Sequence, residues 1–221
     1  MSERAFASYA VFKRRPVEED GFDTARASAE LEELFRKAGD SVRLRGVYTT
    51  TGFTAKADVM FWLTSDSSDR IQDLLVELRR TVLGRTLEPV DTFLGVALPA
   101  EFAKDHQPAF VKGSEPKKYM TVYPFVRTPE WYLLDPRERG GLLREHGEAG
   151  REFPDVLANT TSAFGLGDFE WILCFEADAP ERIVELIRRL RATEARRFTK
   201  VEIPFYTGIK KELSAVVQDL R

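Results

Sequence analysis

Hydrophobic and polar positions divide the first part of the chain into strands and helices. Alternation of apolar and polar residues, or a run rich in aromatic residues, predicts strands at 5–12, 42–49, 58–63 and 90–98. Apolar residues recur every three or four positions over 25–38 and 69–81, which predicts two amphipathic helices. The first helix should end at Gly39, a residue type common just after a helix.

The same order of elements returns in the second part. We expect strands at 119–126, 157–163, 168–173 and 199–206, one helix that begins at Asp135, and another over 181–193. Asp135-Pro136 is a typical helix start, and Asp178 before Pro180 should cap the last helix in the same way. Each part thus has the order β-α-β-β-α-β of a ferredoxin-like unit.

An internal repeat supports two equivalent units. The frame Arg-Ile-x-x-Leu-x-x-x-Leu-x-x-Thr runs from Arg70 to Thr81 and again from Arg182 to Thr193, an offset of 112 residues. In both copies an aromatic strand with a tryptophan precedes this helix. The repeat indicates that one supersecondary unit occurs twice in the chain.

We therefore predict three segments in the chain. These are an N-terminal ferredoxin-like half at 1–98, a linker with three prolines at 99–118, and a C-terminal ferredoxin-like half at 119–221. Helices on one face of each sheet would leave the other face open. We place on the open faces the apolar residues Phe61, Leu63, Phe93, Val122, Ile172, Cys174 and Phe205. Two such faces packed together would give an α+β fold, a dimeric-type α+β barrel built from tandem repeats.

Composition and charge exclude several classes of protein. The chain has 221 residues, 43% of them hydrophobic, and a net charge of −3, so we expect no nucleic-acid partner. Its single cysteine excludes an internal disulfide and a cysteine-bound iron–sulfur cluster. No run of about 18 apolar residues and no N-terminal apolar stretch is present, so we expect a cytoplasmic protein without a membrane partner. Nucleotide-binding and acyl-transfer motifs are also missing from the sequence.

His146 is the histidine with the more informative setting. It shares a helix stripe with Leu142 and Phe153, so it should point inward, and Gly147 and Gly150 flank it. Each glycine costs a helix interior about 1 kcal/mol relative to alanine, which suggests a flat group against this backbone. A core histidine bonded to a carbonyl and a haem iron ligand both fit the spacing. A zinc-type site does not, because no second ligand stands at metal-ligand spacing.

Two other residue types are ambiguous from spacing alone. Tyr119, Tyr123 and Phe125 alternate on a strand, which is typical of core or of a barrel lining. Glu194 follows the last helix and either faces solvent among arginines or accepts the second ring N–H of His146.

Four ordered motifs resemble a known family. They are Lys118–Arg127 (KYMTVYPFVR), Glu130–Leu133 (EWYL), His146–Arg151 (HGEAGR) and Asp168–Trp171 (DFEW). Together they are similar to the coproheme decarboxylases of the chlorite-dismutase-like superfamily, above all to their actinobacterial branch. The resemblance covers nearly the whole second half, and in the first half it rests on the fold and the repeat.

The resemblance implies roles for individual residues. His146 would be the proximal ligand of the haem iron, and Tyr123, 23 residues earlier, the radical-forming residue. His106, in the linker, would be the distal base that assists hydrogen peroxide. Further positions would line the porphyrin, meet its propionates or lie behind the proximal histidine: Arg127, Arg151, Trp171 and Glu194.

The implied activity is oxidative decarboxylation of iron-coproporphyrin III (coproheme) to haem b with hydrogen peroxide, the last step of coproporphyrin-dependent haem biosynthesis. The resemblance also suggests a ring of five copies and a transient contact with a ferrochelatase. One alternative is a chlorite dismutase or haem peroxidase, although chlorite dismutases carry a distal arginine where this chain has Asn159. The others are a non-catalytic haem-binding carrier and a ligand-binding barrel unrelated to haem.

Overall fold

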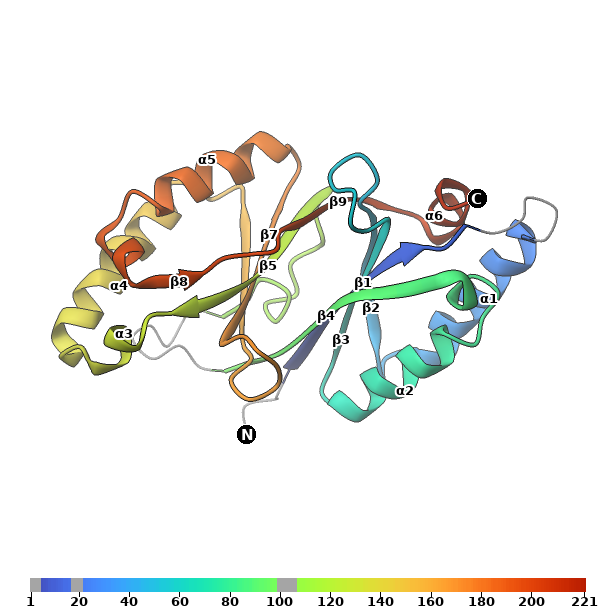
Figure 1. Cartoon of the computed structure of the whole chain (residues 1–221), viewed down its shortest axis with the longest axis horizontal. Helices are drawn as coiled ribbons and strands as arrows, with labels where there is room; N and C mark the ends of the chain where they lie inside the picture. The colour runs from blue at the N-terminus through green and yellow to red at the C-terminus, as the bar shows by residue number, and fades with distance from the viewer. Residues whose placement is uncertain (1–4, 17–21, 99–106) are drawn as a thin grey trace. The chain divides into compact units, whose positions relative to one another are not determined.

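The computed structural model describes residues 5–16, 22–98 and 107–221 (Figure 1). Contacts within the chain divide it into two compact units. Unit 1 comprises Met1–Val96 and Tyr206–Arg221, and unit 2 comprises Ala97–Phe205. The last 16 residues of the predicted C-terminal half, Tyr206–Arg221, therefore belong to unit 1.

Unit 1 is an antiparallel sheet with helices on one face (Figure 1). Its elements are β1 (Ala5–Arg14), α1 (Thr24–Ala38), β2 (Arg43–Thr49), β3 (Val59–Ser65), α2 (Ser68–Leu78), the 3-10 turn η2 (Gly84–Thr86), β4 (Leu87–Ala97), β9 (Tyr206–Lys211) and α6 (Leu213–Asp219). The strands lie in the order β4-β1-β3-β2-β9. The core between sheet and helices contains Phe61 of β3, Leu31 of α1 and Val217 of α6.

Unit 2 repeats this plan and carries the candidate site. Its elements are β5 (Tyr119–Arg127), α3 (Pro129–Leu133), α4 (Pro136–Arg151), β6 (Leu157–Ser162), β7 (Trp171–Ala177), α5 (Pro180–Leu190), η3 (Glu194–Phe198) and β8 (Thr199–Val201). The strands lie in the order β6-β7-β5-β8, and Tyr123 of β5 is in register with Leu173 of β7. The predicted order β-α-β-β-α-β is confirmed in both units, and the fold is α+β as predicted.

Local chemistry explains where the helices begin and end. The Asp135 carboxylate accepts a hydrogen bond from the backbone N–H of Arg137 and caps α4, as predicted. Gly39 ends α1 with a φ of 52°, a left-handed conformation that favours glycine. The prediction for Asp178 was wrong: Ala179 occupies the N-cap position of α5, and the Asp178 carboxylate instead pairs with Lys117 at 2.6 Å.

Two other predictions need correction. The expected strand at 199–206 is split, because β8 ends at Val201 and β9 begins at Tyr206. Pro204 lies between them and has no N–H to donate to a strand ladder. Phe61, Leu63 and Phe205 pack in the helix-side cores rather than on the open faces, since a shift of one residue along a strand reverses the face.

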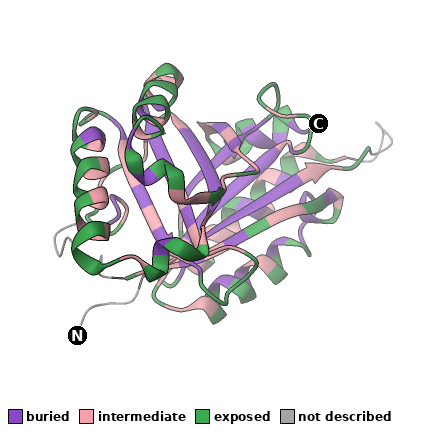
Figure 2. Cartoon of the chain, turned by 60° about the vertical axis from the view of Figure 1, so that its left-hand side comes forward, coloured by how far each residue is buried: buried purple, intermediate pink, exposed green. Residues whose placement is uncertain are grey.

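Helix α4 is attached differently from α5. In unit 2, α5 packs on β5 and β7, whereas the extensive contacts of α4 are with α5 and η3. Ala149 is the buried residue of α4, while α5 buries Ile183 and Leu186. Figure 2 shows the buried residues concentrated in the strands, with exposed residues along the outer sides of the helices. Among the described helices, none is long and apolar enough to cross a membrane.

Candidate active site

Unit 2 contains the described residues to which the sequence assigns a role. Tyr123 and Arg127 lie on β5, His146 and Arg151 on α4, Trp171 at the start of β7 and Glu194 on η3. His106 lies outside the described residues.

Tyr123 is a buried side chain on the helix-facing side of the sheet. It is 4% exposed, and its ring stacks on Phe205 with the centroids 4.3 Å apart. No residue in the described ranges hydrogen-bonds to its hydroxyl group. Burial raises the pKa of the Tyr123 phenol above its usual value, and the nearby Glu202 carboxylate raises it further. The phenol is therefore protonated at neutral pH, and its oxygen is available to a ligand.

The ring of His146 is held by a threonine hydroxyl. Thr193 Oγ1 donates its only proton to the carbonyl of Leu190 at 2.8 Å. Its contact with His146 Nδ1, at 3.3 Å, therefore favours an imidazole N–H that donates to the hydroxyl oxygen. In a neutral ring this places the lone pair on Nε2, which is the nitrogen that can then ligate a metal.

The threonine that ends the repeated frame, Thr81 in unit 1 and Thr193 in unit 2, makes related hydrogen bonds in the two units. In unit 1, Thr81 Oγ1 donates to the carbonyl of Leu78 at 2.7 Å and accepts from the backbone N–H of Gly84 at 3.0 Å. In unit 2, Thr193 keeps the donation to the helix end, but its hydroxyl oxygen contacts His146. Sequence reasoning missed Thr193 as a site residue, although the repeated frame contains it.

The glycines beside His146 are not required by protein packing. A Cβ atom at Gly147 would meet the tip of Arg151 at 4.0 Å, and one at Gly150 would meet Leu190 at 3.9 Å, both no closer than ordinary contact. Because α4 also makes few contacts with the strands, a flat group can approach this backbone. The space beside Gly147 and Gly150 therefore supports the interpretation that these glycines accommodate a ligand.

Two of the predicted ligand-binding residues lie on the surface. The Glu194 carboxylate pairs with Arg197, and its backbone N–H contacts Glu145 at 3.3 Å. Arg151 is exposed at the end of α4, and its guanidinium lies 3.9 Å from the Glu148 carboxylate. The hydroxyl group that contacts the His146 ring belongs to Thr193, one residue before Glu194.

Arg127 is more enclosed than Arg151. Its guanidinium donates to the carbonyl of Ala195 at 2.8 Å and lies over the rings of Trp131 and Phe125, at 4.1 and 4.6 Å. Burial lowers the pKa of Arg127 to about 10, so the group is still charged at neutral pH. A half-buried positive charge close to Tyr123 can attract a carboxylate ligand.

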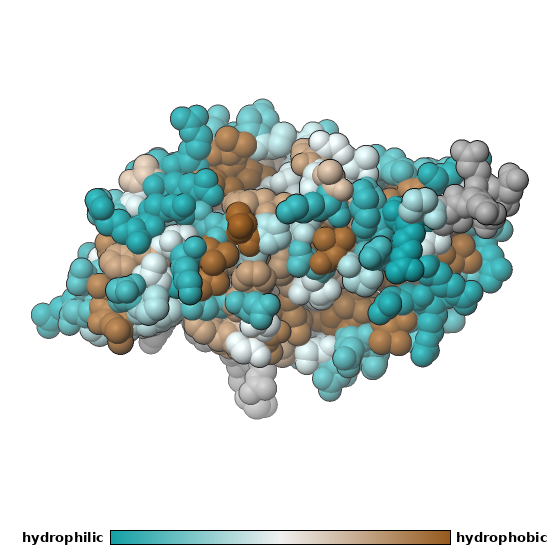
Figure 3. Space-filling model, viewed as in Figure 1, coloured by the Kyte–Doolittle hydropathy of each residue, from teal (hydrophilic) through white to brown (hydrophobic). Residues whose placement is uncertain are grey.

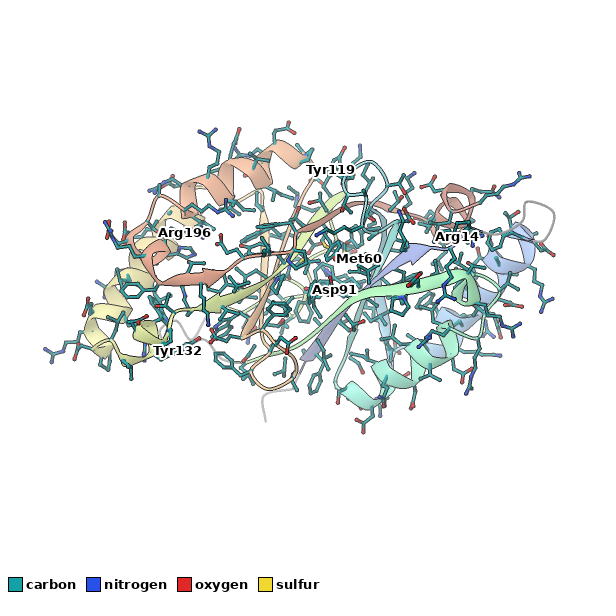
Figure 4. All side chains as sticks on the ribbon, in the orientation of Figure 1. Arg14, Met60, Asp91, Tyr119, Tyr132 and Arg196 are labelled. Carbon is teal, nitrogen blue, oxygen red and sulfur yellow. The ribbon has the colours of Figure 1, made fainter. Side chains whose placement is uncertain are left out.

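Trp171 belongs to an aromatic and carboxylate network at the end of β7. Its ring contacts Phe164 edge-on at 5.3 Å, and Phe164 contacts the Tyr132 ring edge-on at 5.9 Å. Tyr132 in turn donates to Glu170 at 2.6 Å (Tyr132 is labelled in Figure 4). Glu170 also accepts the backbone N–H of Arg127 at 2.7 Å. This network fixes the end of β5 that carries Arg127.

Asn159 faces the other side of the sheet. It is in register with Cys174, and its amide donates to the buried Glu176 at 3.0 Å. The neighbouring Ala158 packs in the helix-side core, and Thr160 shares its face by alternation along β6. The helix-facing side of β6 therefore carries no guanidinium.

The donors present suit a metal held by one protein ligand. Within the part of the chain that the structure describes, no group of three or more His, Cys, Asp or Glu side chains is placed to hold a metal ion. A single imidazole with a proton on Nδ1 is instead sufficient as the protein ligand of a haem iron. These features define a class of α+β proteins with tandem ferredoxin-like units and a histidine-bearing helix over a tyrosine-bearing sheet.

The chain belongs to the chlorite dismutase family, whose sequence profile matches residues 24–211. It is 45% identical over 217 residues to the coproheme decarboxylase of Mycolicibacterium smegmatis, covering 97% of this chain and 94% of the relative. It is 27% identical over 175 residues to the coproheme decarboxylase of Thermus thermophilus, covering 74% of this chain and 70% of the relative. The predicted resemblance is thereby confirmed.

Solved structures show the same fold. The chlorite dismutase of Candidatus Nitrospira defluvii in complex with imidazole superimposes with a TM-score of 0.86, covering 98% of this chain and 94% of that chain at 23% identity. A putative chlorite dismutase gives a TM-score of 0.82 at 19% identity, covering 99% of this chain and all of that chain.

Proposed function

We propose that this chain is a coproheme decarboxylase that converts iron-coproporphyrin III to haem b with hydrogen peroxide. In this reaction two propionate side chains become vinyl groups. Each loses carbon dioxide while one peroxide is reduced to water. The iron of the bound substrate supplies the redox chemistry that couples peroxide reduction to oxidation of the propionate.

One observation carries the proposal. Tyr123 and His146 belong to the same layer of unit 2, the tyrosine on the helix-facing side of β5 and the histidine on the stripe of α4 that carries Ala149 and Phe153. A ligand placed in this layer meets a phenol from the sheet and an imidazole from the helix.

The residues present fit an iron porphyrin. The contact between His146 and Thr193 favours the ring form with a lone pair on Nε2, and the glycines of α4 leave the backbone accessible. Porphyrin propionates are anions, and Arg127 offers a charged group beside Tyr123. The helix-facing side of β6 lacks a guanidinium, which argues against a chlorite dismutase.

Each side chain then has a specific task. His146 holds the iron through Nε2, and Thr193 fixes the orientation of its ring. Tyr123 presents its hydroxyl group to the reacting propionate and gives up a hydrogen atom when oxidised. Arg127, Trp171 and Arg151 orient the porphyrin, Glu194 lies near the proximal histidine, and His106 assists peroxide as a base. Residence in the cytoplasm, a ring of five copies and contact with a ferrochelatase stay predictions from the family.

Substitution of Tyr123 by phenylalanine tests the proposal. Tyr123→Phe removes one oxygen atom that has no partner among the residues described, so the fold and coproheme affinity should be preserved. We expect decarboxylation to be lost, because a phenyl ring has no O–H hydrogen to give up. The measurement is mass analysis of porphyrin products after peroxide addition, with Tyr119→Phe on the same strand as the control. Haem b formed by the Tyr123 variant at the wild-type rate would contradict the proposed role.

A further inference from the structure

A cluster of three charged side chains lies at the border of the candidate site. Glu202, directly after β8, accepts hydrogen bonds from Arg191 at 2.9 Å and from Arg196, both on the same oxygen, Oε2. Arg191 follows α5 and Arg196 belongs to η3 (Arg196 is labelled in Figure 4). Figure 3, in the same view, shows hydrophilic residues over η3 and α4. The cluster thus joins three segments of unit 2.

The cluster is close to Tyr123. Arg191 lies over the ring of Phe205 at 5.9 Å, and Phe205 stacks on the Tyr123 ring at 4.3 Å. The charges of Glu202, Arg191 and Arg196 all act on the Tyr123 hydroxyl group. A carboxylate bound to these arginines would therefore lie next to the phenol.

The exposure of the three side chains is unequal. Glu202 is 14% exposed, whereas Arg191 and Arg196 are 44% and 42% exposed. The carboxylate is thus enclosed, while the two guanidinium groups reach solvent with several of their five N–H donors unused by Glu202. Two arginines on one carboxylate carry a net positive charge, and they can take up a second anion.

Chemistry favours a carboxylate as that anion. The guanidinium group can bind a carboxylate through paired N–H donors. Here Arg191 and Arg196 each donate one N–H to a single oxygen of Glu202, so each keeps further donors for a second carboxylate. The proposed substrate carries four propionates and the product two. A binding site for one more carboxylate at this position would therefore distinguish the two porphyrins. This step rests on the function proposed above.

We propose that Arg191 and Arg196 form a seat for one substrate propionate and that Glu202 is an internal carboxylate with which the propionate competes. The arrangement favours the four-carboxylate porphyrin over its two-carboxylate product. Glu202 keeps the two guanidinium groups together when no porphyrin is bound, and it lowers their affinity for an external anion.

The test measures binding of iron-free porphyrins, so it needs no turnover. Fluorescence titration compares coproporphyrin III, with four carboxylates, and protoporphyrin IX, with two. Arg191→Gln and Arg196→Gln should each weaken coproporphyrin binding on the order of tenfold, the size of one charge-assisted hydrogen bond, and change protoporphyrin binding much less. Glu202→Gln should tighten coproporphyrin binding several-fold, because it removes the competing charge.

Matched controls come from the same helix. Arg189→Gln removes a guanidinium that pairs with Glu152, and Glu185→Gln removes a carboxylate that pairs with Arg182. Neither control should alter the preference for coproporphyrin. Circular dichroism of all variants checks that the fold is retained.

The outcomes separate this inference from the proposed function. If the wild type binds neither porphyrin, both the function and the seat are wrong. If it prefers coproporphyrin but the arginine variants keep that preference, only the seat is wrong. Weaker or unchanged binding in a folded Glu202→Gln variant would show that Glu202 is a purely structural partner, which overturns the competition.

Discussion

A single hydroxyl group favours a proton on Nδ1 of His146. Thr193 has one proton, and that proton is bound to the Leu190 carbonyl. In that arrangement the oxygen lone pairs face the imidazole, which favours donation from the ring through Nδ1. If His146 holds the iron as proposed, this helix-ending threonine would be its orienting partner, a task that a carboxylate performs in many metal sites.

Replacing Thr193 with valine should loosen His146 and weaken its donation to iron. We expect a lower iron–histidine stretching frequency in the resonance Raman spectrum of the coproheme complex, because the ring loses its acceptor at Nδ1.

Thr81→Val is the control, since Thr81 makes the same donation to a helix end in unit 1. Both variants should lose about 1 kcal/mol of folding stability, but only the Thr193 variant should shift the frequency. An equal frequency in both variants would exclude the orienting role of Thr193.

Helix α4 combines a weak intrinsic preference for helix with few contacts to the sheet. It contains Gly140, Gly141, Gly147 and Gly150 among its 16 residues. The segment directly after its C-terminal end is instead tied to α5, since Glu152 pairs with Arg189 and Asp155 with Arg182, both at 2.7 Å. The helix is thus held to its neighbour by charged groups near its C-terminal end rather than by a broad apolar face.

Alanine at Gly147 separates helix stability from ligand binding. The new Cβ atom has space, so Gly147→Ala should stabilise the ligand-free protein by up to about 1 kcal/mol. If the porphyrin lies against this backbone, the same methyl group should weaken coproporphyrin binding.

Gly141→Ala, with nothing within 4 Å of its Cβ atom and an exposed position, should stabilise α4 without an effect on binding. Thermal unfolding and porphyrin titration measure the two effects. Equal affinity in both variants would remove the argument that Gly147 accommodates the ligand.

The ion pair of Asp155 predicts a loss of stability in acid. The Arg182 guanidinium lowers the pKa of Asp155 to about 2, from an unfolded value of about 3.9. A depressed carboxyl pKa stabilises the folded chain above the unfolded value, and this contribution is lost as the pH falls toward about 2. Asp155→Asn should therefore differ most from wild type above about pH 4. Urea unfolding at several pH values tests this, and a constant difference down to pH 2.5 would contradict it.

At the scale of the whole molecule, the two units share a plan but only unit 2 carries the candidate site residues that the structure describes. Added coproporphyrin should therefore slow amide hydrogen exchange in α4, η3 and β5, and leave α1 and α2 unchanged. Exchange measured by mass spectrometry with and without porphyrin tests this distribution. Protection confined to unit 1 would place the ligand elsewhere.

The fold was predictable where local chemistry determines it. The repeated Arg-Ile frame and the Asp135 cap fixed the order of the elements, because both act within a few residues. Pairing over long distances in the sequence was not predictable. No local pattern indicates that β9 pairs with β2 or that α6 packs on α1.

The candidate site was likewise predictable where local sequence determines it, and not where distant segments meet. Tyr123 and His146 were recognised from motifs and from their stripes, and the structure places both in unit 2. The contact of Thr193 with His146 and the pairing of Glu202 with Arg191 instead join segments that are separate in the sequence. Local sequence patterns do not predict which segments come into contact, so these two features are visible only in the folded structure.

The loose attachment of α4 to the sheet has a consequence for the lifetime of the protein. A ligand bound in that layer would add contacts between the helix and the sheet that the chain alone does not make. By mass action, each tenfold rise in free ligand above the dissociation constant stabilises the folded state by about 1.4 kcal/mol. Susceptibility of the α4 segment to proteases then falls as porphyrin accumulates. The abundance of the protein would thus follow the supply of its own substrate, without any separate regulator.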